Sequence, residues 1–193
     1  PGLEDAAGRI RRGHHHVGLI TEFLDNLRAF TEGTPAETTR ECLPSIMREA
    51  VAIAQQGVVE VPEGLEFRLS LPDSLFIAGH RSRLLMAFIN ILTNAIEACE
   101  AGGRPGRIAV TIAPQADDFA RIHITDNGCG MSRDAVLDCV DLFSSSKPSG
   151  MGFGLPITRK VIEQDHSGTL VLESQAGEGT TVTVLLPIER MDV

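Results

Sequence analysis

The sequence predicts an α+β fold, a two-layer α/β sandwich in which helices cover one face of a mixed, largely antiparallel sheet. Two kinds of segment carry this prediction. Some repeat their apolar residues every three or four positions, as amphipathic helices do, whereas others alternate apolar and polar residues, as half-buried strands do. Most of the strand-like segments come in pairs around short polar turns, which indicates hairpins.

The first expected element is a helix over residues 9–31, whose apolar residues follow heptad spacing. The seam consists of Ile10, Val17, Ile20, Leu24 and Leu27. Other apolar side chains widen this stripe beyond what a lone helix can hide, so it needs a partner helix from this chain or from a second copy. The break at Gly33–Pro35 separates a helical segment, residues 1–34, from a second region, residues 35–193.

Two helices are predicted in the first half of the second region. One covers residues 39–56 and has Pro44 in its first turn, where the missing N–H of proline costs little. The other covers residues 81–100 and ends at Gly102 and Gly103. It is strongly apolar, so we expect it in the core.

Two more helices are predicted toward the end of the chain. The helix over residues 132–140 begins at Ser132, a favourable N-cap residue. The helix over residues 152–164 ends before Gly168, which suits the following turn. Between these helices, residues 144–151 form a loop of Ser, Gly and Pro that is too polar to pack.

The predicted strands show apolar–polar alternation or are short and bounded by turn signals. They cover residues 65–71, 74–77, 107–112, 119–125, 169–174 and 180–187. The segment 74–77 is expected to pair with the strand before it. The last four strands form two hairpins around the polar turns Pro114–Asp118 and Gly177–Gly179.

Charge and composition argue against nucleic acid as a partner. The chain has 17 Lys and Arg against 26 Asp and Glu, a formal net charge of −9 that repels phosphate polymers. It has no Trp and no Tyr to stack on single-stranded bases.

The four cysteines show no metal-binding spacing and are expected to be reduced thiols. We expect a cytoplasmic piece of a longer protein, which could be anchored in a membrane upstream.

A first motif lies on the predicted helix over residues 81–100. Asn90 and Asn94 are four residues apart and therefore share a helical face, with Glu97 or Ala98 one turn further on. Amides among apolar residues need partners. A hard cation that bridges to phosphate oxygens is one such partner, and neighbouring backbone groups are the alternative.

A second motif is Asp-Asn-Gly-Cys-Gly-Met over residues 126–131. Asp126 follows an apolar strand, and its carboxylate could accept a hydrogen bond from an exocyclic amine such as that of adenine. Gly128 and Gly130 would let a flat ring approach the backbone without a Cβ in the way. The alternative is a plain Asn-Gly turn without a ligand.

A third motif is the glycine run over residues 150–155, at the start of a predicted helix. Gly150, Gly152 and Gly154 precede the free N–H groups of the first helical turn, which favour phosphate oxygens. The run is neither a Walker A loop nor a dinucleotide fingerprint. Lys147 in the preceding loop could reach the outer phosphates, or could be an ordinary solvated lysine.

In this order, the motifs resemble the catalytic ATP-binding domain of sensor histidine kinases, in the superfamily shared with gyrase, a heat-shock chaperone and MutL-type proteins. Residues 90–98 resemble the asparagine box, residues 126–131 the first glycine box, and residues 150–155 the second glycine box. Two further segments, 142–147 and 177–187, are similar to the phenylalanine box and the closing Gly-x-Gly-Thr strand. The resemblance covers roughly the whole second region.

The resemblance implies a site for Mg²⁺ and ATP. It implies that Asn94 coordinates Mg²⁺, with Asn90 assisting near the phosphates, and that Asp126 receives the adenine amine. Residues 132–151 would contain an ATP lid, with Lys147 on the phosphates. The nucleotide-binding residues implied are Asn94, Ala98, Asp126, Gly128, Gly130, Met131, Phe143, Ser146, Lys147, Gly150, Gly152, Phe153, Gly154, Leu155 and Thr180.

The histidines at residues 14–16 are not expected to accept the phosphoryl group. The family's acceptor is usually followed by Glu or Asp, with a proline a few residues on, and this segment has neither. Residues 9–31 instead resemble the second helix of the dimerisation hairpin, so the acceptor is expected upstream of this chain. His80 stands where relatives often carry Asp, and His123 and His166 are expected to be structural or exposed.

The resemblance therefore implies a histidine kinase of a two-component system, which binds Mg²⁺-ATP and donates the γ-phosphoryl group to a histidine. Its expected partners are ATP or ADP, the acceptor histidine of the dimerisation domain, a response regulator and a second copy of the full-length protein. Two alternatives share the pocket. An anti-sigma-type serine kinase should lack the dimerisation helix, and a non-catalytic, nucleotide-gated dimerisation module should bind ATP without labelling a histidine.

Overall fold

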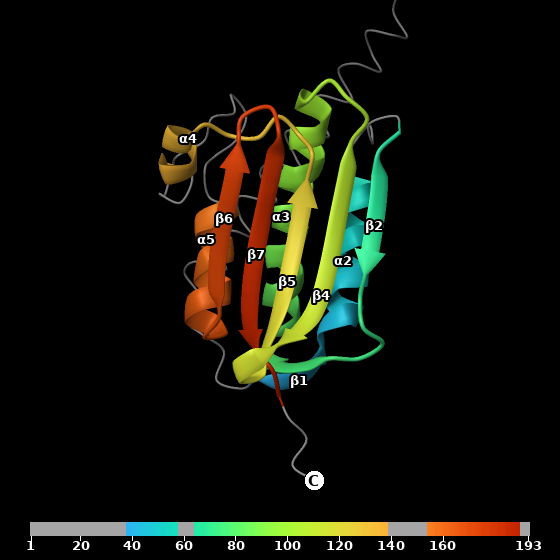
Figure 1. The fold of residues 1–193 in the computed structure, drawn as a ribbon. Coiled ribbons are helices and arrows are strands. Elements are labelled where there is room, and N and C mark those ends of the chain that lie inside the picture. Colours follow the sequence, from blue (N-terminus) through green and yellow to red (C-terminus); the bar gives the residue numbers. More distant parts are fainter. Residues whose placement is uncertain (1–37, 58–63, 139–153, 190–193) are drawn as a thin grey trace, which may run out of the picture. The chain divides into compact units, whose positions relative to one another are not determined.

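The computed structural model of the chain describes residues 38–57, 64–138 and 154–189 (Figure 1). In these residues, helices cover one face of a five-stranded sheet, so the predicted two-layer α+β sandwich is confirmed. The predicted helix over residues 9–31 and the predictions that fall within residues 139–153 lie outside the described residues. The division of the chain into two regions stays a prediction.

The sheet has the strand order β2-β4-β5-β7-β6. Its strands are β2 (Glu66–Ser70), β4 (Arg107–Gln115), β5 (Phe119–Asp126), β6 (Thr169–Gln175) and β7 (Gly179–Pro187). β2 pairs in parallel with β4, whereas the remaining neighbours pair antiparallel and include both predicted hairpins. Alternate residues such as Ile108, Ile122 and Ile124 are buried, because one face of the sheet packs against the helices.

The helical layer behind the sheet in Figure 1 consists of α2 (Leu43–Gly57), α3 (Arg81–Ala101) and α5 (Gly154–Arg159). The last of these continues as a π-helix, η2 (Lys160–Asp165). In α3, Phe88, Leu92 and Ile96 recur every four positions and are fully buried. Length and composition alone would let α3 cross a membrane. Its packing in the core accounts for its apolar residues.

The predicted helix over residues 39–56 begins later than expected, at Leu43. The preceding residues form strand β1 (Thr39–Cys42), which pairs antiparallel with β3 (Phe76–Gly79) in a separate two-stranded sheet. The prediction that residues 74–77 pair with the strand before them was therefore wrong. The reason is tertiary, because hydrogen bonds to a distant segment outweigh the weak local preference for a helix.

Two other predicted helices are present, and one of them departs from regular α-helical geometry. Ser132 caps α4 (Arg133–Asp138) as predicted, because its Oγ accepts the N–H of Ala135 at 3.3 Å. The predicted helix over residues 152–164 is helical throughout its described part, but at Lys160 it changes from α to π hydrogen bonding. Such a widened turn shifts the following side chains around the helix, which a regular 3.6-residue pattern does not predict.

Candidate functional site

The end of the motif on α3 and the motif after β5 meet at one end of the sheet, at the top of Figure 1, beside the turn between β6 and β7. Two backbone hydrogen bonds join these segments. The N–H of Cys129 donates to the carbonyl of Ala98 at 2.9 Å, and the N–H of Gly177 donates to the carbonyl of Cys129 at 2.7 Å. The loop after β5, residues 127–132, is therefore held between α3 and that turn.

Asp126 is the last residue of β5, and 7% of its surface is exposed. Its Oδ1 accepts the N–H of Gly128 at 2.8 Å, so the carboxylate stabilises the loop that follows it. Burial raises the pKa of Asp126, whereas the N–H groups of Gly128 and Thr180 and the charge of Arg104 act in the opposite direction. The chain bends at Gly128 and Cys129, and the buried carboxylate of Asp126 is hydrogen-bonded to this bend.

The two glycines of this loop have a packing role that the sequence interpretation missed. A Cβ on Gly128 would overlap the backbone of Ala98, and a Cβ on Gly130 would overlap the carbonyl of Gln175. Gly130 also has a φ of +61°, in the left-handed region that favours glycine. The missing side chains let segments of the protein approach one another, whereas the approach of a flat ring to this loop stays a prediction.

Thr180 and Met131 are linked to the same end of the sheet through Ser174 on β6. Thr180 is the cross-strand partner of Asp126 in the pairing of β5 with β7. The hydroxyl of Thr180 lies 2.9 Å from that of Ser174, and Ser174 Oγ accepts the N–H of Met131 at 2.8 Å. These contacts connect three strands around the carboxylate.

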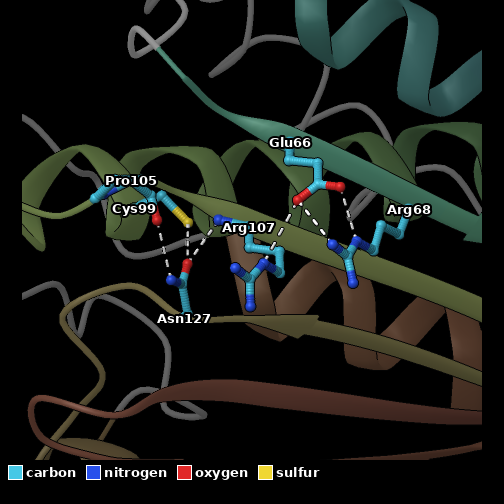
Figure 2. Close-up of polar contacts among 6 residues, drawn as sticks. All are labelled: Glu66, Arg68, Cys99, Pro105, Arg107 and Asn127. Atoms are coloured by element: carbon cyan, nitrogen blue, oxygen red, sulfur yellow. Dashed lines mark hydrogen bonds and ion pairs between the residues drawn. The ribbon is translucent and has the colours of Figure 1, made fainter.

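Two residues to which sequence analysis gave no role hold the loop in place. Arg104 donates from Nε to the carbonyl of Asn127 and from Nη2 to that of Glu178, both at 2.8 Å. The Oδ1 of Asn127 accepts the N–H of Arg107 at 2.6 Å, and its Nδ2 donates to the carbonyl of Pro105 at 3.1 Å (Figure 2). Both residues act mainly on backbone atoms that are distant in the sequence, so no periodic pattern marks them.

The predicted polar face of α3 carries Asn90, which is half-buried, and Asn94, which is exposed. Asn90 Nδ2 donates to the hydroxyl of Thr158 on α5 at 3.1 Å, so this amide bonds a side chain that is distant in the sequence. A Cβ on Gly154 would lie 2.7 Å from Asn90 Oδ1, so the glycine lets α5 approach the amide. Leu155, the next residue, packs against the core.

The remaining predicted nucleotide-binding residues lie outside the described residues; they are Phe143, Ser146, Lys147, Gly150, Gly152 and Phe153. Most of the predicted lid, residues 132–151, does so as well. Within the described ranges, no group of three or more His, Cys, Asp or Glu could hold a metal ion. A divalent ion here would depend on amide oxygens and on oxygens of its own ligand.

A second polar cluster lies at the N-terminal end of α3. Arg83 and Asp165 form an ion pair at 2.5 Å, with 9% and 1% of their side chains exposed. The Nε2 of His166 accepts the N–H of His80 at 2.9 Å, and its Nδ1 donates to the carbonyl of Val161 at 2.7 Å, so the ring is neutral. Burial lowers the pKa of His166, which is structural, whereas His80 provides no side-chain cap for α3.

A sandwich of this kind, with a buried aspartate at the end of a strand and glycines in the loop that follows, is the arrangement expected of an ATP-binding domain. Residues 79–190 match the family of histidine kinase-, DNA gyrase B- and HSP90-like ATPases, and the chain belongs to this family. Its relatives include sensor proteins and histidine-protein kinases, and its fold is that of histidine kinase catalytic domains.

Three similar proteins illustrate this relationship. The chain is 31% identical over 187 residues to the sensor protein FixL of Bradyrhizobium diazoefficiens. This alignment covers 97% of this chain and 36% of FixL. It is 38% identical over 172 residues to sporulation kinase B of Bacillus subtilis, with coverage of 89% and 38%. The nucleotide-free catalytic domain of the histidine kinase ThkA has a TM-score of 0.67 and 25% identity, over 78% of this chain and 95% of that one. This chain therefore spans little more than a third of the length of FixL and of sporulation kinase B.

Proposed function

We propose that the chain contains the catalytic domain of a sensor histidine kinase, which binds Mg²⁺-ATP and donates the γ-phosphoryl group to a histidine. ATP binding follows from membership of the ATPase family. The observation that carries the proposal is Asp126, a buried carboxylate that backbone N–H groups hold at the end of β5. Relatives that are named signal transduction histidine-protein kinases support phosphoryl transfer as the reaction.

In this proposal, Asp126 is the acceptor for the exocyclic amine of adenine. Because the carboxylate is buried, a hydrogen bond that it accepts there is stronger than the same bond in water. Arg104 and Asn127 already hold the adjoining loop through backbone contacts. Less freedom is therefore lost when a ligand binds, which favours affinity. Gly130 and Met131 would border the adenine ring.

The amides on α3 fit a proposed site for a hydrated Mg²⁺, with Asn94 as ligand and Asn90 assisting. Their oxygens suit a hard cation, and Gly154 lacks the Cβ that would crowd the amide of Asn90. The ion would supply neutralisation of phosphate charge. The chain itself would position the triphosphate through these amides, through Lys147, and through the glycine run over residues 150–154.

The proposed reaction breaks the bond between the γ-phosphorus and the bridging oxygen, releases ADP, and forms a bond from phosphorus to an imidazole nitrogen. Catalysis is mainly positioning and charge neutralisation, so no covalent intermediate on this domain is needed. The proposed partners are an acceptor histidine upstream of this chain, a response regulator and a second copy of the full-length protein. We also propose a cytoplasmic location, which agrees with the free thiols of Cys42, Cys99 and Cys129.

The replacement Asp126→Asn tests the pocket. We expect ADP binding, measured by calorimetry, to weaken by at least about 100-fold, because an amide can present N–H groups where the adenine amine needs a charged acceptor. The matched control is Asp73→Asn, at an exposed aspartate away from the site, which should leave ADP affinity unchanged. Undiminished affinity in Asp126→Asn would refute the pocket assignment.

A labelling experiment separates the reaction from its alternatives. The chain is incubated with γ-labelled ATP and Mg²⁺, alone and together with a longer fragment that carries the upstream segment. Acid-labile label on the longer fragment supports a histidine kinase. Acid-stable label on serine supports the anti-sigma-type kinase, and nucleotide binding without any label supports the dimerisation module. Label on residues 14–16 of the chain itself would contradict an upstream acceptor.

A further inference from the structure

We propose that Thr158 is a positioning residue that determines which end of the Asn90 amide faces the phosphate side of the site. The inference rests on the proposed function and deepens it, because it assigns a role to a buried hydroxyl that does not itself reach the nucleotide. Thr158 lies on α5, and 1% of its surface is exposed. It joins the helix of the second glycine box to the helix of the asparagine box.

The single hydrogen of the Thr158 hydroxyl is already engaged. The hydroxyl of Thr158 donates to the carbonyl of Gly154, one turn earlier on the same helix, at 2.9 Å. A hydroxyl has one hydrogen, so toward any further partner it can act only as an acceptor. That partner is Asn90, whose side chain lies 3.1 Å from Thr158 Oγ1. The atom of Asn90 that faces Thr158 must therefore be Nδ2, the donor.

The amide is held in place by packing, whereas its orientation depends on this bond. The two ends of an Asn amide are nearly identical in shape, so close contact alone cannot select between them. A Cβ on Gly154 would lie 2.7 Å from Oδ1 and 2.8 Å from Nδ2 of Asn90, which places both atoms beside the glycine. With Nδ2 bound to Thr158, Oδ1 is the atom left to face a ligand.

The orientation has a chemical consequence for the proposed cation. An amide oxygen can bind Mg²⁺ or accept a hydrogen bond from a water of its hydration shell, whereas an amide NH2 group can do neither. If the amide rotated by half a turn, Nδ2 would take the place of Oδ1, and the positive end of the amide dipole would face the cation. Thr158 is buried, so bulk water cannot easily replace its hydroxyl as the acceptor. Thr158 thus acts through Asn90, as outer groups around metal sites orient the inner ones.

The test compares the nearly isosteric Thr158→Val with Thr158→Ser, which keeps the hydroxyl. Calorimetry of the chain measures ADP affinity with Mg²⁺ and with a chelator, and the ratio gives the gain from Mg²⁺. We expect Thr158→Val to reduce this gain by about 10- to 100-fold, with metal-free affinity kept within about twofold. Thr158→Ser should restore it. Thr158→Ala serves the same purpose if the Val variant does not fold.

The matched control is Thr183→Val, which removes a hydroxyl from β7 that contacts His123. It should leave both affinities unchanged. A double-mutant cycle with Asn90→Ala then tests the route of the effect, because Thr158→Val should cause no further loss once the amide is absent. Additive losses, or equal losses with and without Mg²⁺, would overturn the positioning role.

Failure of this inference and failure of the proposed function give different results. If the unmodified chain gains affinity from Mg²⁺ and Thr158→Val keeps that gain, the role of Thr158 is wrong and the proposed function stands. If the unmodified chain binds no ADP under either condition, the proposed function is wrong and the role of Thr158 is wrong with it.

Discussion

Helix α3 takes part in two polar regions that are built on different principles. Near its N-terminus, charge meets charge: Arg83 pairs with Asp165, and both side chains are almost completely buried. Further along, the contacts are neutral. Asn90 bonds the hydroxyl of Thr158, and Gly128 brings the loop after β5 against the backbone of α3.

The difference separates a region that is satisfied by the protein itself from the region in which the nucleotide is proposed to bind. In the first region, buried charges are compensated by each other, and both ring nitrogens of His166 have backbone partners. In the second region, glycines without a Cβ allow segments of the chain to approach closely, and backbone N–H groups donate hydrogen bonds to the carboxylate of Asp126. We expect the first region to determine folding stability and the second to determine nucleotide affinity.

The largest expected effect is on stability, from Asp165→Asn. Removing this charge leaves the buried Arg83 without its closest counter-charge, so the free energy of unfolding should fall by about 3–5 kcal/mol. Urea denaturation measures the loss. The ADP affinity of the molecules that remain folded should be unchanged.

The matched control for that prediction lies on the same π-helix. Glu163 pairs with Arg159 at 3.8 Å, with about a third of each side chain exposed. Glu163→Gln should therefore change the free energy of unfolding by less than about 1 kcal/mol. If the two substitutions lowered the free energy of unfolding equally, the distinction between the buried Arg83–Asp165 pair and an ordinary surface ion pair would be contradicted.

A smaller effect, on stability and affinity together, is expected from Gly128→Ala. Its Cβ would overlap the backbone of Ala98, so the loop must shift, at a cost of about 1–3 kcal/mol in the free energy of unfolding. Since Asp126 binds the N–H of this residue, ADP affinity should fall as well.

Gly177→Ala is the control, because Gly177 has a φ of +81° and open space around it. We expect a cost of about 1 kcal/mol from the backbone conformation and little change in ADP affinity. A Gly128→Ala variant that loses stability but binds ADP normally would show that the loop position does not set affinity.

The smallest predicted effect is a pH dependence of stability from His166. Its pKa is lowered from 6.5, chiefly by burial, among the facing groups His80, Arg83 and Asp165. Below pH 6.5 the unfolded chain binds a proton that the folded chain does not, so the free energy of unfolding falls as pH drops. The slope is at most about 1.4 kcal/mol per pH unit. Thermal unfolding at several pH values should show this slope in the parent and in His123→Gln, and a reduced slope in His166→Gln.

The elements whose signals are local could be predicted from the sequence. The hairpin of β4 and β5, the apolar helix α3 and the Ser132 cap all follow from residues close to one another in the chain. The strand β1 was missed because its structure depends on pairing with β3, which lies more than thirty residues away. The change to a π-helix at Lys160 was missed because a regular helical period does not encode it.

The candidate site divides in the same way. The order of the motifs was sufficient to place Asp126 and Asn90 in one family's pattern, and family membership is confirmed. The contacts of Arg104 and Thr158 were not predictable, since each residue meets atoms that only folding brings near. The glycines of the loop were interpreted as room for a ligand, whereas their Cβ positions face other parts of this chain.

The sequence by itself determined the class of fold, the family and the residue types available for nucleotide chemistry, because periodicity and motif order are properties of the chain. The tertiary structure decided which polar groups compensate one another and which surround the proposed nucleotide site. That assignment depends on contacts between segments far apart in the sequence, such as α3 with α5 and the loop after β5 with the turn between β6 and β7. Hydrogen-bond partners, burial and the orientation of an amide become defined only when those segments meet.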